Sequence, residues 1–129
     1  MYERKIPELS DCGLLVTMKV IGGKWKAWII NCIKDGVRRP SAIHKVMHNV
    51  SPRIVNRHLR ELEVYGIIHR ETYVESPARV EYWLTDVGES ILPVIQVLET
   101  WGDKNKIHVN RQNVDYKSGS CVHLPNISN

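Results

Sequence analysis

Apolar and polar positions separate most clearly between Ser51 and Gly66, where side chains at helical spacing fall onto two faces. Val55, Leu59 and Leu62 lie at i, i+4 and i+7 and form an apolar stripe. The opposite stripe is polar and consists of Arg53, Asn56, Arg57 and Arg60. Serine is a typical N-cap, and glycine is the residue type most often found just past a helix end. The pattern therefore predicts an amphipathic helix between these two residues.

Three further patterns with helical spacing come before this segment. The first follows Ser10 or Asp11 and ends at residues 22–23, the second runs from residue 24 to Gly36, and the third covers residues 40–48. Their apolar positions are Leu14, Leu15, Met18 and Ile21, then Trp25, Trp28, Ile29, Cys32 and Ile33, then Ile43, Val46 and Met47. A tight turn joins the third predicted helix to the fourth. Two short helices joined in this way are typical of a helix-turn-helix, whose second helix is the recognition helix.

After the fourth predicted helix the hydrophobic period changes from helical to two. Residues 67–74 are rich in strand-forming side chains, residues 75–78 carry a turn signal, and residues 79–84 alternate again. A hairpin directly after a helix-turn-helix is a wing. Two interpretations of its arginines, Arg70 and Arg79, stay open: they contact the DNA backbone or minor groove, or they pair with Glu71 and Glu81.

A last long helix is predicted from Thr85, with Pro93 expected to kink it. Its apolar residues cover more than one stripe, which a small domain cannot easily bury. We therefore expect the first and last helices to form a homodimer interface, the alternative being a monomeric core. The expected interface residues are Leu14, Leu15, Met18, Ile91, Ile95, Leu98 and Trp101.

Length and charge add to this picture. The 129 residues fit one domain of ordinary size, and the net charge of +4 with a pI near 9.1 favours a polyanionic partner. Neither an apolar signal segment nor a membrane span is evident, and three widely spaced cysteines fit a reducing compartment, so a cytoplasmic protein is expected. The predicted organisation is a flexible arm (1–9), a mainly α (α+β) winged helix-turn-helix with dimerisation helices (10–104), and a tail (105–129).

The polar stripe has the chemistry of double-stranded DNA recognition. Arginine matches guanine O6 and N7, and asparagine matches adenine N6 and N7, in the major groove. We expect Arg53, Asn56 and Arg57 to contact base edges and Arg60 to contact phosphate. The alternatives are a solvated basic helix face and a winged helix that binds protein instead of DNA.

Other candidate chemistry is weaker. His44 and His48 have the i, i+4 spacing of two metal ligands, but no third ligand is evident, and neither a metal nor a cofactor is expected. No phosphate loop, nucleophile elbow or catalytic triad is present, so we do not expect an enzyme. Cys12 lies near the start of the first helix, where backbone N–H groups favour a thiolate. Cys32 is expected in the core, and Cys121 is an exposed thiol or a second redox partner.

Several motifs in the right order give the chain a family resemblance. They are Gly22-Gly23-Lys24-Trp25, Ser51-Pro52-Arg53, Leu59-Arg60-Glu61-Leu62-Glu63, Pro77-Ala78-Arg79-Val80-Glu81-Tyr82, Leu84-Thr85, Gly88 and Trp101-Gly102. Between residues 12 and 102 the chain resembles the HxlR-type winged helix-turn-helix regulators of bacteria.

The resemblance implies a homodimer that binds palindromic operator DNA and controls transcription in response to oxidants, quinones or aldehydes. It places Arg53, Asn56 and Arg57 in the groove, with Cys12 as a candidate sensor of oxidants or electrophiles. The residues expected near the DNA backbone are Lys24, Arg39, Ser51, Arg60 and Arg79. The chain departs from the family at Cys12-Gly13, where Cys-Pro is usual, and at Arg39-Pro40, where Arg-Phe is usual. The second departure predicts that the first strand of the wing is short or absent.

Overall fold

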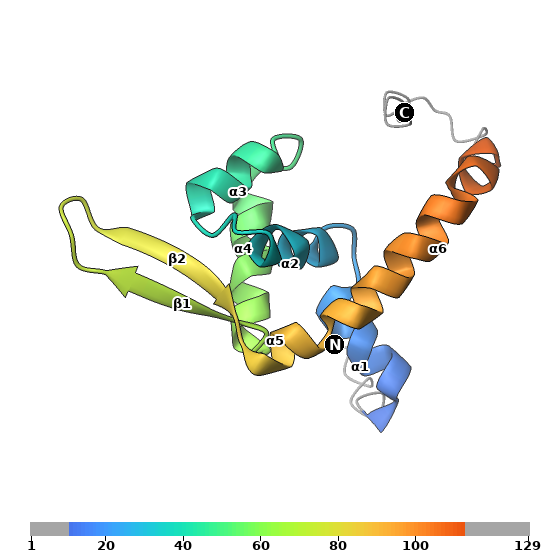
Figure 1. Ribbon diagram of the computed structural model, residues 1–129, viewed down its shortest axis with the longest axis horizontal. Helices are drawn as coiled ribbons and strands as arrows, with labels where there is room; N and C mark the ends of the chain where they lie inside the picture. The colour runs from blue at the N-terminus through green and yellow to red at the C-terminus, as the bar shows by residue number, and fades with distance from the viewer. Residues whose placement is uncertain (1–10, 113–129) are drawn as a thin grey trace, which may run out of the picture. The chain divides into compact units, whose positions relative to one another are not determined.

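The computed structural model describes residues 11–112 and confirms a mainly helical chain with one hairpin (Figure 1). It contains two units, one ending at Leu92 and the other beginning at Pro93. The elements are α1 (Gly13–Ile21), α2 (Lys26–Lys34), α3 (Pro40–Val46), α4 (Pro52–Val64), β1 (Ile68–Tyr73), β2 (Arg79–Leu84), α5 (Asp86–Ser90) and α6 (Leu92–Arg111). The predicted arm, residues 113–129 of the predicted tail and Cys121 lie outside the described residues.

The core of the first unit forms where α2, α3 and α4 meet the hairpin. Its fully buried side chains are Ile29, Ile30, Ile33, Ile43, Met47, Val55, Leu59, Leu62 and Ile68, and all but Ile30 come from the apolar or strand-forming positions that the sequence predicts. Trp28, on the edge of the apolar face of α2, is 39% exposed and lies against the Trp25 ring, because the buried stripe of this helix is centred on the isoleucines. The apolar stripes thus decide how the helix-turn-helix packs.

Helix α4 begins and ends as its sequence predicts. The Ser51 hydroxyl accepts a hydrogen bond from the Ile54 backbone N–H at 3.3 Å, and Pro52 occupies the first turn. Gly66 follows the helix with φ +75°, a backbone conformation that costs glycine little. The apolar stripe of α4 faces α2 and β1, so its polar stripe is left on the surface.

The hairpin pairs β1 and β2 in an antiparallel register that sets Arg70 opposite Tyr82 and Tyr73 opposite Arg79. Within residues 11–112 the sheet has only these two strands. The segment before α3 contributes a single ladder bond, in which the Tyr82 N–H donates to the Arg38 carbonyl at 2.9 Å. The segment before α3 therefore adds one hydrogen bond to the hairpin, whereas the first strand of the wing, β1, is six residues long and is not short or absent as the Arg39-Pro40 departure predicted.

The chain after β2 differs from the prediction of one continuous helix. Thr85 does cap a helix, accepting a hydrogen bond from the Gly88 N–H at 3.0 Å, but this helix, α5, ends at Ser90. A new helix, α6, starts at Leu92 and continues to Arg111, beyond residue 104, where the pattern predicted that order would be lost. Pro93 explains the break, because it lacks an N–H and its ring would clash with the carbonyl four residues earlier. In the first turn of α6 neither penalty applies.

The other departures lie at helix ends. Cys12, and neither Ser10 nor Asp11, occupies the N-cap of α1, and α2 begins at Lys26 instead of Lys24. The later start of α2 follows from Gly23, whose φ of +79° places it in a turn. No helix within residues 11–112 is long and apolar enough to cross a membrane.

Candidate nucleic-acid interface

The recognition face, defined here as Arg53, Asn56, Arg57 and Arg60, lies exposed on α4. Within residues 11–112 the three arginines form neither an ion pair nor a hydrogen bond through their side chains. The carboxylate nearest to them in sequence, Glu61, pairs instead with Lys26 of α2 and with His58. The guanidinium groups are therefore available to an external anion.

Asn56 has a partner in the preceding helix. Its Oδ1 lies 3.0 Å from Nε2 of His44, which is in α3. This contact connects the two helices of the helix-turn-helix at the recognition face. His44 is also one of the two histidines whose i, i+4 spacing resembles a pair of metal ligands. Within the described residues no group of three or more potential metal ligands is brought together.

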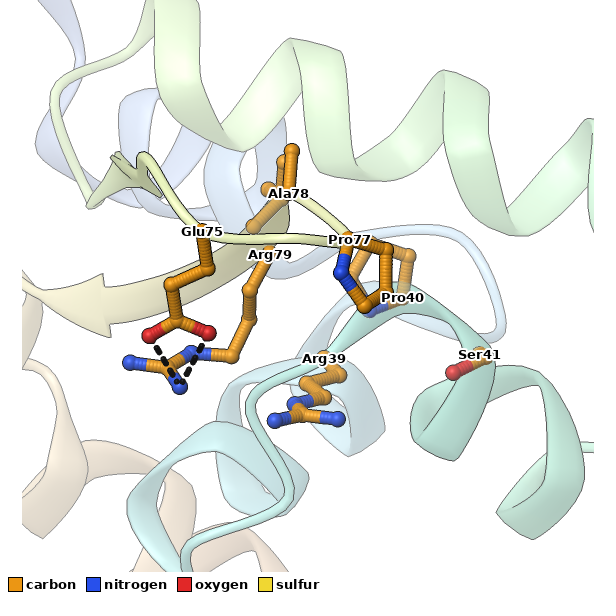
Figure 2. A pocket seen from close by; sticks show the side chains of 8 residues that line it. Arg39, Pro40, Ser41, Glu75, Pro77, Ala78 and Arg79 are labelled. Atoms are coloured by element: carbon orange, nitrogen blue, oxygen red, sulfur yellow. Dashed lines mark hydrogen bonds and ion pairs between the residues drawn. The ribbon is translucent and has the colours of Figure 1, made fainter.

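Arg39 and Arg79 border one cleft of about 400 Å³ between the start of α3 and the turn of the wing (Figure 2). The cleft, called here the wing cleft, is lined by Arg39, Pro40, Ser41, Glu75, Pro77, Ala78, Arg79 and Val80. Figure 2 shows Arg39 and Pro40 on the α3 side and Glu75 with Arg79 on the wing side. Arg39 is exposed, and its side chain forms no hydrogen bond, ion pair or ring contact within residues 11–112.

Arg79 is held from three sides. Its Nη1 lies 3.0 Å from Glu75 Oε2, its Nε lies 3.2 Å from Glu81 Oε2, and its guanidinium carbon lies 4.2 Å from the centre of the Tyr73 ring. Of the two interpretations that the sequence left open for this arginine, pairing with Glu81 is the one observed. Glu75 is a further partner that alternation along the strands did not indicate, because it lies in the turn.

Within residues 11–112 the Lys24 side chain has no hydrogen bond or ion pair with the recognition face. It is exposed and lies over the Trp25 ring, with Nζ 5.2 Å from the ring centre. Two residues later, Lys26 contacts Glu61 at 3.6 Å and the Tyr65 ring at 5.5 Å, both at the C-terminal end of α4. Ser51 and Arg53 lie at the opposite end of this 13-residue helix, about 12–21 Å away from these contacts along its axis.

A second cluster, which the sequence did not predict, consists of His58, Glu61 and Lys26. His58 is buried, with Nδ1 3.2 Å from Glu61 Oε1. The hydrogen bond from His58 and the charge of Lys26 lower the pKa of Glu61. The i, i+3 spacing of histidine and glutamate was the available signal. The cluster holds α4 against α2 and keeps Glu61 away from the recognition face.

The two cysteines in the described residues have different surroundings. Cys12 is exposed at the N-cap of α1, whereas Cys32 is buried in α2, as predicted. Burial, followed by the nearby charge of Asp35, raises the pKa of the Cys32 thiol. Cys12 is therefore the accessible thiol in this part of the chain.

Helices α1 and α6 each expose large apolar side chains. Leu14 is 69% exposed on α1, and Trp101 is 60% exposed on α6. The others exposed on these helices are Leu15, Val16, Met18, Val94, Val97, Leu98, Ile107 and Val109. Of the remaining residues predicted for the interface, Ile91 is partly buried and Ile95 is buried.

The helix-turn-helix, its wing and the unpaired arginines agree with the result of sequence comparison. A family model described as HxlR-like helix-turn-helix matches residues 20–110. The chain belongs to the HxlR-like family. An HTH-type transcriptional regulator of Methanothermobacter thermautotrophicus is 44% identical over 91 residues, which cover 70% of this chain and 70% of the relative. YybR of Bacillus subtilis, also an HTH-type transcriptional regulator, is 36% identical over 108 residues, covering 82% and 86%.

Solved structures extend the likeness to three dimensions. The redox regulator HypR in its reduced form has a TM-score of 0.71 at 35% identity, over 76% of this chain and 97% of HypR. The predicted winged helix-turn-helix fold is therefore confirmed. This HxlR-like protein is a DNA-binding transcriptional regulator, and the relatives that it matches are regulators, not enzymes.

Proposed function

We propose that this HxlR-like protein binds palindromic operator DNA as a homodimer, with Arg53, Asn56 and Arg57 contacting base edges. The observation that carries the proposal is the exposed recognition face, whose arginines have no carboxylate partner within residues 11–112. A buried apolar stripe fixes α4 on its other side, which leaves these side chains free to enter a major groove. A regulator of this kind acts on its DNA in the cytoplasm and performs no catalysis.

Phosphate contacts are proposed around this centre. Arg60 lies on the same face, Ser51 lies at the N-terminus of α4, and Arg39 is free at the edge of the wing cleft. For Lys24 and Arg79 a phosphate contact stays a prediction with less support. Lys24 lies over the Trp25 ring two residues before the lysine that pairs with Glu61, and Arg79 is held by two carboxylates.

Replacing Arg57 by alanine tests the base contacts. We expect the affinity for the preferred duplex to fall by about 1–3 kcal/mol and the preference at one base pair to relax. Site selection from a random duplex library, followed by fluorescence anisotropy at several salt concentrations, measures both effects. Arg111→Ala, which removes an exposed arginine at the end of α6, is the matched control and should leave affinity and preference unchanged.

The alternative function, a winged helix that binds protein without specific DNA binding, predicts a different result. Duplex binding would then be weak and indifferent to sequence, and Arg57→Ala and Arg111→Ala would lower it equally. Such a pair of results would contradict the regulator proposal.

Redox sensing is proposed for Cys12. The relative HypR is a redox regulator, and Cys12 is an accessible thiol at the start of a helix. We expect diamide or a quinone to change the affinity of the parent protein for its selected duplex by tenfold or more, on the order of 1.4 kcal/mol. Cys12→Ser should abolish this response, with Cys32→Ser as a control. A full response in the Cys12 variant would remove Cys12 from the mechanism.

A further inference from the structure

The contact between His44 and Asn56 has a defined direction. A carboxamide oxygen only accepts hydrogen bonds, so His44 Nε2 is the donor to Asn56 Oδ1 across the 3.0 Å between them. His44 is half-buried on α3, and Asn56 is exposed on α4. Within residues 11–112 no other hydrogen bond to the Asn56 side chain is formed.

The orientation of an asparagine amide decides which base it accepts. The two ends of the amide have similar shapes, and rotation about its last side-chain bond is roughly two-fold. One orientation offers the oxygen to a base amino group and the nitrogen to a base acceptor, as in the two-bond contact with adenine N6 and N7. The flipped orientation exchanges donor and acceptor, so an unrestrained asparagine discriminates poorly.

We propose that His44 is a positioning residue for base recognition, which holds the Asn56 amide in one orientation and so narrows its choice to adenine. The oxygen has two lone pairs, so the bond from His44 leaves one for the adenine N6 amino group. Both Nδ2 hydrogens also remain free, and one of them can be donated to N7. This inference rests on the proposed base contact of Asn56.

The exposure of the contact supports a role in orientation rather than in folding. A hydrogen bond between side chains that water can reach exchanges one partner for another and contributes little net stability. The main effect of this hydrogen bond is therefore geometric, because it reduces the two orientations of the Asn56 amide to one before DNA binds. Preorganisation of this kind improves discrimination without adding any contact to the DNA.

The test uses the full chain and first assigns a base pair to Asn56. A site selection with the parent defines the preferred half-site, and the base pair whose preference is lost in Asn56→Ala is the pair that Asn56 reads. Anisotropy titrations then compare adenine with the other three bases at that pair. The variants are His44→Leu, which removes the donor, and the similarly shaped pair His44→Gln and His44→Glu, of which only glutamine can donate.

We expect His44→Leu and His44→Glu to reduce the preference for adenine about five- to tenfold, and His44→Gln to retain most of it. The glutamate adds a negative charge and should weaken binding to all sequences, which is why relative preference is the readout. His44→Leu should leave the salt dependence and thermal midpoint unchanged. His48→Leu, at an exposed histidine just after α3, is the matched control and should behave like the parent.

Several results would overturn the inference. Unchanged adenine preference in all three His44 variants, or equal loss in His44→Gln and His44→Glu, would show that the bond does not set the amide orientation. If Asn56→Ala alters no base preference while Arg57→Ala does, Asn56 is not a base reader, although the regulator proposal stands. If the parent selects no sequence at all, the proposed function itself fails. Should His44→Leu not fold, the glutamine and glutamate pair decides the outcome.

Discussion

At the scale of single residues, the arginines of this protein differ in whether their guanidinium groups already have an anionic partner. The arginines of the recognition face have no anionic partner within residues 11–112, whereas Arg79 has two carboxylates and an aromatic ring. The formal charge of an arginine therefore does not show whether it can neutralise a phosphate. Availability depends on the carboxylates that the fold brings within reach.

Glu75 should act as a restraint on DNA binding by the wing. In Glu75→Gln one of the two carboxylates that hold Arg79 is lost, and its guanidinium can turn toward the DNA backbone. We expect tighter binding to every duplex and a salt dependence steeper by up to about one phosphate contact, roughly 0.9 in the slope of log K against log salt.

Glu71→Gln is the matched control, since Glu71 lies opposite Glu81 in the same hairpin and has no contact with Arg79. It removes the same charge without freeing the arginine, so its slope should equal that of the parent. Equal slopes for Glu75→Gln and Glu71→Gln would contradict the restraint.

At the scale of elements, the passage from β1 to α5 depends on a close backbone approach. The Ile67 carbonyl accepts a hydrogen bond from the Thr85 N–H at 3.0 Å, the Thr85 hydroxyl donates to the neighbouring Gly66 carbonyl at 2.6 Å, and Gly88 lies against the Ile67 carbonyl. These contacts fix the end of the hairpin and the start of α5 together. Gly88 and Leu84-Thr85, part of the family resemblance, thus have a structural reason.

Gly88→Ala should destabilise the protein. A Cβ at this position would overlap the Ile67 carbonyl oxygen, and a backbone atom cannot move aside as a flexible side chain can. We expect the free energy of unfolding, measured by urea denaturation, to fall by about 1–3 kcal/mol.

Gly102→Ala is the control, because its expected effect on the free energy of unfolding is zero or of opposite sign. This glycine lies in the interior of α6, a Cβ there would have no atom within 4 Å, and alanine is the better helix former. The substitution should leave stability unchanged or raise it by up to about 1 kcal/mol. If both variants lose stability equally, the close approach is not what Gly88 provides.

At the scale of the whole molecule, helices α1 and α6 each expose several large apolar side chains, and exposed apolar patches often mark interaction surfaces. We propose that a second copy covers these side chains. Recognition helices related by a two-fold axis then address half-sites about 34 Å apart, which is the reason for expecting a palindromic operator.

Leu14→Glu should separate the subunits without unfolding them, because Leu14 is exposed in a single chain. Light scattering after size-exclusion chromatography should show a monomer, and affinity for the full palindrome should fall about 100-fold as the two half-sites lose their linkage. Val64→Glu, which also places a charge at an exposed apolar position, should remain dimeric. A monomeric parent, or a dimeric Leu14 variant, would contradict the proposed interface.

The amino-acid sequence was sufficient to predict the helix-turn-helix, the wing and the polar face of α4. These features depend on local periodicity, on the caps at Ser51 and Thr85 and on the turn glycines, all of which neighbouring residues specify. Burial of Ile30 and the extension of α6 to Arg111 were not predicted, the latter because a regular apolar period is lacking there.

The contacts between charged and polar side chains depend on tertiary packing and could not be predicted from the sequence. Glu75 with Arg79, His58 with Glu61 and Lys26, and His44 with Asn56 each depend on how a turn or neighbouring helix is packed. Side-chain spacing places a residue on a face but cannot show what another element brings to that face. For this protein the sequence identifies the surface that meets DNA, and the fold determines which of its side chains are free and how they are held.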